Sequence, residues 1–241
     1  MRTHVISCAV AAAALLSAGL TSTAHASMLV GWDLLNATAA SGTTNDGTAN
    51  DVSPTTIAGG ISSTVLSRGA GFVVPGPIGF TGRGNMGTDS GSGPATLAAA
   101  VTANFYVQFT VTPSGPMSLS SLDLAAYQQN LHNPDLSTVA VEYDSGAGYT
   151  LAGSATGISD GWTGNAHTVD LSGIADLQNV AAPVAFRLYF YGFGAYEVRG
   201  LGQVPGSNTD LGLNGSAGAV PEPASLGLLG LGALALLRRR R

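Results

Sequence analysis

The sequence predicts an all-β fold, an antiparallel β-sandwich. Several short segments alternate apolar and polar residues, with the period of two that a strand with one buried face requires. Glycine-rich turns separate these segments, and the middle of the chain has no long segment with the 3.6-residue period of an amphipathic helix. Hydrophobic residues are 45% of the chain, which favours a folded core over disorder. A barrel or a jelly roll is the alternative arrangement of such strands.

The chain divides into three parts, because both of its ends differ in composition from the middle. We expect residues 1–26 to be a signal peptide and residues 27–219 to form one β-domain, which we call the body. Residues 220–241 form a separate C-terminal segment, which we call the tail. The body has a length that one β-domain can fill.

The predicted signal peptide has the three expected parts and would form an N-terminal helix. Arg2 gives it a positive end, residues 5–20 are apolar, and Ala24 and Ala26 provide the small-x-small pattern that signal peptidase cleaves. An uncleaved membrane anchor is the alternative. The only cysteine, Cys8, lies within this segment, so a cleaved body has no disulfide, no cysteine-bound zinc and no cysteine nucleophile.

The body is acidic. It holds four arginines and no lysine against thirteen acidic residues, which leaves a net charge of −9. A nucleic-acid-binding surface must be basic in order to displace counterions from phosphates, so we expect no nucleic-acid partner.

The body opens with a predicted strand at residues 28–34, where every even position is apolar. A loop rich in Gly, Ser, Thr and Asn follows over residues 36–60. Two short strands are expected at residues 63–67 and 71–74. Residues 79–94 contain many glycines and are predicted to form a second long loop.

The clearest strand pattern spans residues 103–111, where four apolar residues alternate with polar or amphipathic ones. Further alternating segments follow at residues 119–126, 138–144 and 167–171. A short helical turn is expected at residues 171–177.

The last predicted strands lie near the end of the body. Even positions of residues 184–191 are apolar and are expected to face the core, and strands at residues 196–201 and 211–213 complete the sandwich. The residues of the first of these strands that are predicted to point outward are Arg187, Tyr189 and Tyr191.

The tail combines an extended peptide, an apolar run and a basic end. Pro221 and Pro223 hold Glu222 in a non-helical conformation that a protease can bind. Residues 224–237 are uncharged and would form a helix of about 21 Å, short against a hydrocarbon core of about 30 Å. This helix has no polar face, and arginine side chains beside it can extend its span by reaching the interface. We therefore predict a C-terminal transmembrane helix.

Four arginines, Arg238, Arg239, Arg240 and Arg241, end the chain and are predicted to stop its transfer across the membrane. The positive-inside tendency would keep them in the cytoplasm and place the body outside.

The order of these features resembles the PEP-CTERM sorting signal of Gram-negative bacteria. The resemblance implies recognition of Pro221, Glu222 and Pro223 by a membrane protease of the exosortase class, with cleavage close to them. It further implies export, an inner-membrane intermediate, and a final place at the cell surface or in the extracellular matrix.

The body carries a second resemblance, which spans most of its length and consists mainly of strand and turn residues. It is similar to uncharacterised bacterial surface β-sandwiches of jelly-roll type that often precede such tails. Some sandwiches of that shape bind carbohydrate, so a membrane-tethered carbohydrate-binding module, with extracellular polysaccharide as partner, is the alternative to a structural surface protein. The segments that carry the resemblance are residues 31–33, 67–71, 104–113, 169–178 and 186–192.

Candidate catalytic residues are few, and we predict no enzymatic activity. Residues 88–94 superficially resemble the nucleophile loop of trypsin-like proteases, but neither His132 nor His167 lies in that family's histidine motif, so a loop is the better interpretation. The body's only glutamates, Glu142 and Glu197, alternate with apolar neighbours as solvent-facing strand residues do.

Residues 45–51 gather the oxygen side chains that calcium prefers. Their spacing departs from an EF-hand loop, and turn-forming Asn and Asp explain them, so we predict no metal and no cofactor.

Exposed aromatic residues are the candidates for stacking on a sugar. An outward tyrosine is also a good strand former, and the sequence leaves both interpretations open. The candidates are Trp162, Tyr189, Tyr191 and Tyr196.

Overall fold

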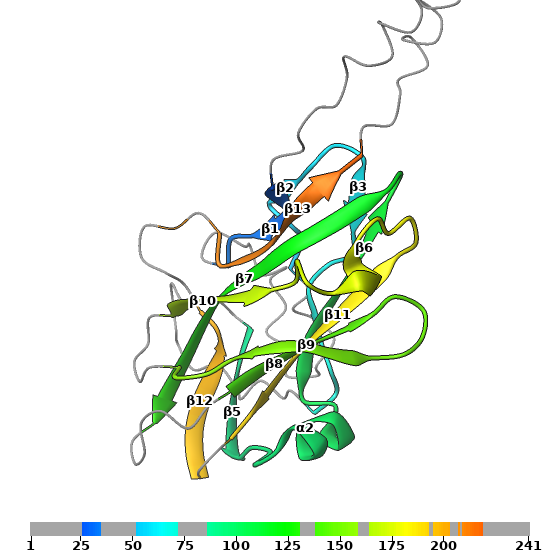
Figure 1. The fold of residues 1–241 in the computed structure, drawn as a ribbon. Coiled ribbons are helices and arrows are strands. Elements are labelled where there is room, and N and C mark those ends of the chain that lie inside the picture. The colour runs from blue at the N-terminus through cyan, green and yellow to red at the C-terminus, as the bar shows by residue number, and fades with distance from the viewer. Residues whose placement is uncertain are drawn as a thin grey trace, which may run out of the picture.

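The structure is a computed structural model, and it describes the body in several stretches (Figure 1). The described residues are 26–34, 52–71, 86–130, 138–158, 164–192, 195–202, 207 and 209–218. The predicted signal peptide and the whole tail lie outside them. Within the described part of the chain, no helix is both long and apolar enough to cross a membrane.

Two antiparallel sheets make up the fold, as the sequence predicted. The seven-stranded sheet consists of β1 (Ser27–Trp32), β2 (Thr56–Ile57), β5 (Met86–Ser92), β7 (Met117–Asn130), β10 (Asn165–Asp170), β12 (Ala195–Leu201) and β13 (Leu211–Ala217). The six-stranded sheet consists of β3 (Ile61–Ser63), β4 (Ser67–Arg68), β6 (Tyr106–Pro113), β8 (Thr138–Asp144), β9 (Thr150–Ala155) and β11 (Val184–Tyr191). One α-helix, α2 (Leu97–Ala103), and one 3₁₀ turn, η1 (Ala175–Leu177), complete the described elements.

The long strand β7 is the centre of the seven-stranded sheet. β13 pairs with its first half, β12 with its last residues and β10 with its middle. Ala125 donates to the carbonyl of Asp210 and accepts from the N–H of Gly202. Both backbone groups of one extended residue point to the same edge, so β12 and β13 follow one another along one edge of β7.

The alternating pattern at residues 103–111 is confirmed. Val107, Phe109 and Val111 of β6 are buried, and their partners on β11 are in register, with Phe186 opposite Phe109. Such cross-strand pairs on a buried face stabilise a sheet, because large apolar side chains meet at short range.

The two sheets share one hydrophobic core. Trp32 of β1 contacts Phe109 of β6 with ring centroids 4.7 Å apart, and Phe109 stacks on Phe186 of β11 at 5.2 Å. All three side chains are buried. These contacts join the inner face of one sheet to that of the other, the arrangement of a β-sandwich.

One of these local predictions was wrong, and two elements were missed. Residues 86–92, predicted as loop, form strand β5, which pairs with β12 through the backbone and needs no apolar alternation to do so. Helix α2 and strand β9 were not predicted. Thr96 caps α2 by accepting from the N–H of Ala99, and Asn104 ends it in the left-handed conformation.

Candidate functional site

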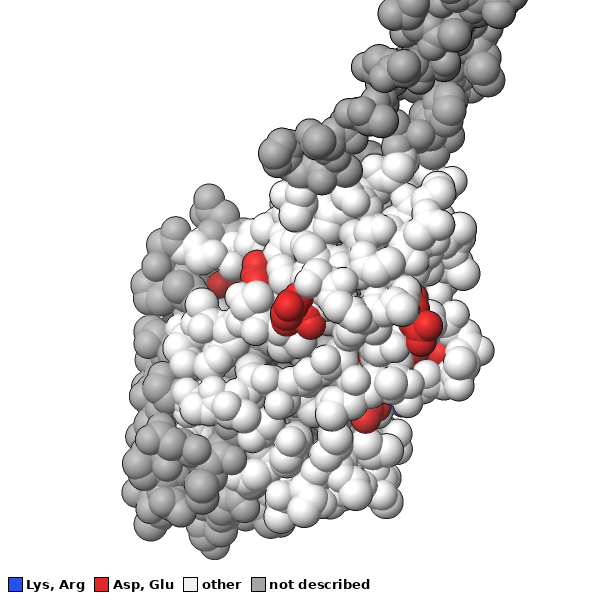
Figure 2. Space-filling view, viewed as in Figure 1, with Lys and Arg blue, Asp and Glu red and all other residues white. Residues whose placement is uncertain are grey.

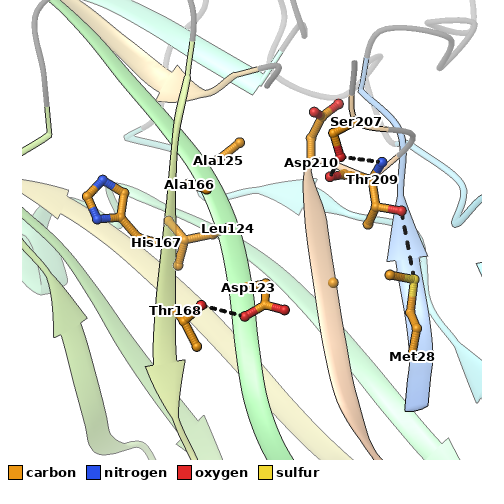
Figure 3. A pocket seen from close by; sticks show the side chains of 11 residues that line it. Met28, Asp123, Leu124, Ala125, Ala166, His167, Thr168, Ser207, Thr209 and Asp210 are labelled. Carbon is orange, nitrogen blue, oxygen red and sulfur yellow. Dashed lines mark hydrogen bonds between the residues drawn. The ribbon is translucent and has the colours of Figure 1, made fainter. Parts of the chain in front are cut away.

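A hollow of about 380 Å³ lies on the outer face of the seven-stranded sheet, over β7, β10 and β13 (Figure 3). The side chains of Met28 and Thr209 lie over Gly31 and Gly212, which leave room for them because they carry no side chain. The hydroxyl of Thr209 lies 3.8 Å from the sulfur of Met28. The lining residues are Met28, Asp123, Leu124, Ala125, Ala166, His167, Thr168, Ser207, Thr209, Asp210 and Gly212.

The carboxylates of this hollow are engaged in structural hydrogen bonds. Asp123 accepts from the hydroxyl of Thr168 at 2.8 Å and from the amide of Asn214 at 2.7 Å, which ties β10 and β13 to β7 (Figure 3). Asp210 is buried, and its carboxylate accepts from the N–H of Leu34 at 2.8 Å. Neither carboxylate is placed as a free acid or base, and no set of metal ligands occurs among the described residues.

His167 lines the same hollow and is half-buried. It stands opposite Leu124 in the β10–β7 pair, and its Nε2 is enclosed with no hydrogen-bond partner. Burial lowers the pKa of His167, because the charged ring would lose its hydration. It is therefore a neutral strand residue, and Figure 3 shows its ring directed away from Ser207 and Thr209.

A second cluster lies on the outer face of the six-stranded sheet, around Arg187 of β11. Its guanidinium lies over the ring of Tyr106 at 4.3 Å and over the ring of Tyr149 at 4.0 Å. It donates to Gln108 at 3.3 Å and to the hydroxyl of Tyr189 at 3.4 Å. Two aromatic faces and two acceptors hold the cation in one place.

Glu142 of β8 stands directly opposite Arg187. Burial raises the pKa of Glu142, and the charge of Arg187 partly offsets that rise. Burial likewise raises the pKa of Tyr149. The cluster thus places a carboxylate acceptor next to a guanidinium donor, beside a half-exposed aromatic ring.

The aromatic residues predicted to stack on a sugar differ in their exposure. Tyr189 of β11 points to the outer face of its sheet but is only 1% exposed, and it packs edge-on against Tyr106. It therefore offers no free face to a sugar. Tyr191 is half-buried. Trp162 and the side chain of Tyr196 lie outside the described residues.

The other predicted sites fall mostly on parts of the chain that are not described. These are Ala24, the loop at residues 45–51, His132, Pro221, Glu222, Pro223, Arg238, Arg239, Arg240 and Arg241. Ala26 directly precedes β1, where a cleavage would leave Ser27 as the first residue. Sequence reasoning missed Tyr149, which follows a glycine turn whose Gly146 and Gly148 N–H groups donate to Asp144, and no alternation marked it.

Comparison with known proteins decides the nature of the tail. Residues 219–241 match the PEP-CTERM protein-sorting motif. This motif marks the chain as an exosortase-sorted protein, which is exported through the membrane to the cell surface or the extracellular space. Processing by exosortase, a membrane protein, follows from the same motif.

The body has no comparable match. No curated protein matches the sequence. Among solved structures, a family 89 glycoside hydrolase from Clostridium perfringens, in complex with 2-acetamido-1,2-dideoxynojirmycin, is similar at 13% identity and a TM-score of 0.23. The match covers 67% of this chain and 15% of the hydrolase.

Proposed function

We propose that this protein is a non-enzymatic component of the cell surface or extracellular matrix, delivered by its two terminal signals. Signal peptidase cleaves after Ala26, and the apolar run at residues 224–237 then holds the body outside the inner membrane. An exosortase-type protease binds Pro221, Glu222 and Pro223 and cleaves near them. The PEP-CTERM motif at residues 219–241 is the observation that carries this proposal.

The described body supports a role without catalysis. The carboxylates of the hollow are bound to neighbouring strands, and His167 is enclosed within a sheet pair. A low content of charged residues, 10% of the chain, and a core between two sheets suit a protein that must persist outside the cell as a folded unit.

The test is substitution of Pro221, Glu222 and Pro223 by alanine in the native host. We expect an unprocessed form to accumulate in the inner membrane, with less protein at the surface, because the protease loses its recognition peptide. Ser225→Ala is the control, because it changes the tail outside the Pro-Glu-Pro peptide and leaves β13 unaltered. Unchanged processing of the triple variant would refute the assignment, and mass spectrometry of both termini of the mature protein locates the cleavages.

A membrane-tethered carbohydrate-binding module is the second candidate, and the Arg187 cluster favours it. Sugar hydroxyls both donate and accept, so a pair of them can bridge the guanidinium of Arg187 and the carboxylate of Glu142. The ring of Tyr149 would lie beside them as an apolar wall. Extracellular polysaccharide is the proposed partner.

Pull-down of the mature protein by surface polysaccharide of the host, together with a glycan array, tests this candidate. Binding should be weakened in Glu142→Gln, which removes the charge of the acceptor, and lost in Arg187→Leu, which removes the donor. Asp170→Asn is the matched control, because Asp170 is an exposed strand residue of the other sheet. Uniformly absent binding of the unaltered protein excludes the module.

A further inference from the structure

Both ends of the described body meet at one end of the sandwich, which we call the tail pole. Ser27, the first residue of β1, pairs with Gly215 of β13, and Gly218 donates to the carbonyl of Pro116 at 2.7 Å. Figure 1 shows β2, β3 and the end of β13 together at this end and α2 at the other. The tail pole comprises residues 27, 58–62, 112–118, 179–183 and 215–218.

Hydrogen bonds join these segments into one surface. Ser114 donates to the carbonyl of Gly60 through both its N–H, at 2.8 Å, and its hydroxyl, at 3.0 Å. Met117 and Val180 exchange two backbone hydrogen bonds of 2.8 and 2.7 Å. The pole is therefore a fixed part of the sandwich.

The tail pole contains no charged residue, although the body around it is acidic. Its segments consist of Gly, Ser, Ala, Pro, Thr, Asn and a few apolar residues. On the face seen in Figure 2, the same end of the described surface shows neither red nor blue, and the acidic side chains lie lower, in separate spots across the middle. The acidic residues of the described body thus lie away from the point at which the chain continues into the tail.

The chain between the pole and the tail is short. Gly218 is three residues from Pro221 and six from Ala224, the first residue of the apolar run. Even fully extended, those lengths span at most about 11 Å and 22 Å. A tail seated in the membrane therefore holds the pole within reach of the lipid headgroups, while strand β6 alone separates it from α2 by about 26 Å.

We infer that the tail pole is the surface on which the body rests against the phospholipid membrane before processing. The inference rests on the proposed membrane insertion of the tail. An anionic lipid surface repels acidic side chains within about one Debye length, roughly 8 Å at physiological salt, and an uncharged pole removes that repulsion. The peptide that contains Glu222 is then held at the membrane surface, where a membrane protease works.

Site-specific fluorescence tests the inference in the form that has lost the signal peptide but still carries the tail, residues 27–241. This form contains no cysteine, so a bimane label can be placed singly at Gly59→Cys on the pole or at Ala98→Cys on α2. Both positions are exposed, and a side chain at Gly59 meets open space. The labelled precursors are reconstituted into vesicles of phosphatidylethanolamine and phosphatidylglycerol that carry a nitroxide quencher on the headgroup.

We expect the label at residue 59 to be quenched several-fold more than the label at residue 98. Twenty Gly/Ser residues inserted between Gly218 and Ala219 should remove most of that difference, because such a linker adds a mean reach of about 25 Å. Ser62→Glu should weaken quenching at residue 59 in anionic vesicles but not in neutral phosphatidylcholine vesicles, and Ser62→Gln should leave it unchanged. Circular dichroism confirms that each variant is folded.

Equal quenching at the two positions, in precursor that floats with the vesicles, would overturn the inference and leave the proposed sorting function intact. Precursor that does not float with the vesicles would instead refute membrane insertion by the tail, and the inference with it. Quenching at residue 59 that is changed neither by the inserted linker nor by Ser62→Glu would also overturn the inference.

Discussion

Replacing Trp32 by alanine should destabilise the body severely, because this side chain joins the two sheets. Trp32 is fully buried, its ring lies 4.7 Å from Phe109, and its Nε1 donates to the carbonyl of Val52 at 3.1 Å. Truncating a buried aromatic residue to alanine costs about 3–5 kcal/mol through lost burial and the cavity left behind. For a domain of this size, that corresponds to a fall in Tm of roughly 6–20 °C.

Trp32→Phe separates the packing of Trp32 from its hydrogen bond. A phenyl ring keeps the contact with Phe109 but cannot donate to Val52, whose carbonyl still accepts from the N–H of Leu66 at 2.8 Å. No buried carbonyl is left without a partner, so we expect a cost of only about 1–2 kcal/mol.

Urea unfolding of the mature protein, followed by far-ultraviolet circular dichroism, measures both variants. The midpoint should fall while the slope stays the same, since the surface exposed on unfolding hardly changes. A cost of Trp32→Ala below about 1 kcal/mol, or equal costs of Trp32→Phe and Trp32→Ala, would contradict this role of Trp32.

The remaining predictions concern a glycine, a histidine and an arginine. Gly215→Ala should lower the free energy of unfolding by about 1–3 kcal/mol, because its Cβ would overlap the Ser118 carbonyl oxygen. Gly59→Ala is the control, because its Cβ meets open space and the change should be neutral or slightly stabilising. Equal urea midpoints of the two variants would contradict this prediction. Burial lowers the pKa of His167 in the folded protein, so the unfolded chain binds the proton more tightly. The free energy of unfolding should therefore fall as the pH drops below about 6.5. His167→Gln should flatten that part of the curve of stability against pH. Arg187→Lys should cost about 1 kcal/mol, because an ammonium cannot lie flat between the Tyr106 and Tyr149 rings, and a double-mutant cycle with Tyr149→Leu should show the coupling; additive effects would argue against the stacked geometry.

Sequence alternation predicted the strands that are buried on one face, since that burial is what creates the pattern. Residues 103–111 and 184–191 show it, and β6 and β11 occupy most of those ranges in register with one another. β5 could not be found this way, because its glycine-rich segment joins the sheet through backbone hydrogen bonds to β12 alone. Backbone pairing of that kind leaves no trace in the choice of side chains.

The Arg187 cluster shows a different limit of sequence reasoning. Alternation correctly directs Arg187 and Tyr189 away from the core, but it cannot say what covers the outer face. The segment at Gly69 lies against the ring of Tyr106, and Tyr106 in turn packs on Tyr189. Tyr149 comes from a turn after β8, distant in sequence from both rings. A site assembled from three separate segments requires the tertiary structure to be seen.

The two proposed cleavage sites are placed so that the chain could lose both ends and keep its fold. β1 begins at Ser27, directly after the predicted cleavage at Ala26, and its outermost pair is with Gly215 of β13. β13 ends at Ala217, four residues before Pro221. Neither cleavage cuts a paired strand, so neither one removes a ladder hydrogen bond or a side chain of the core. The proposed cleavages thus leave the paired strands of the described body intact.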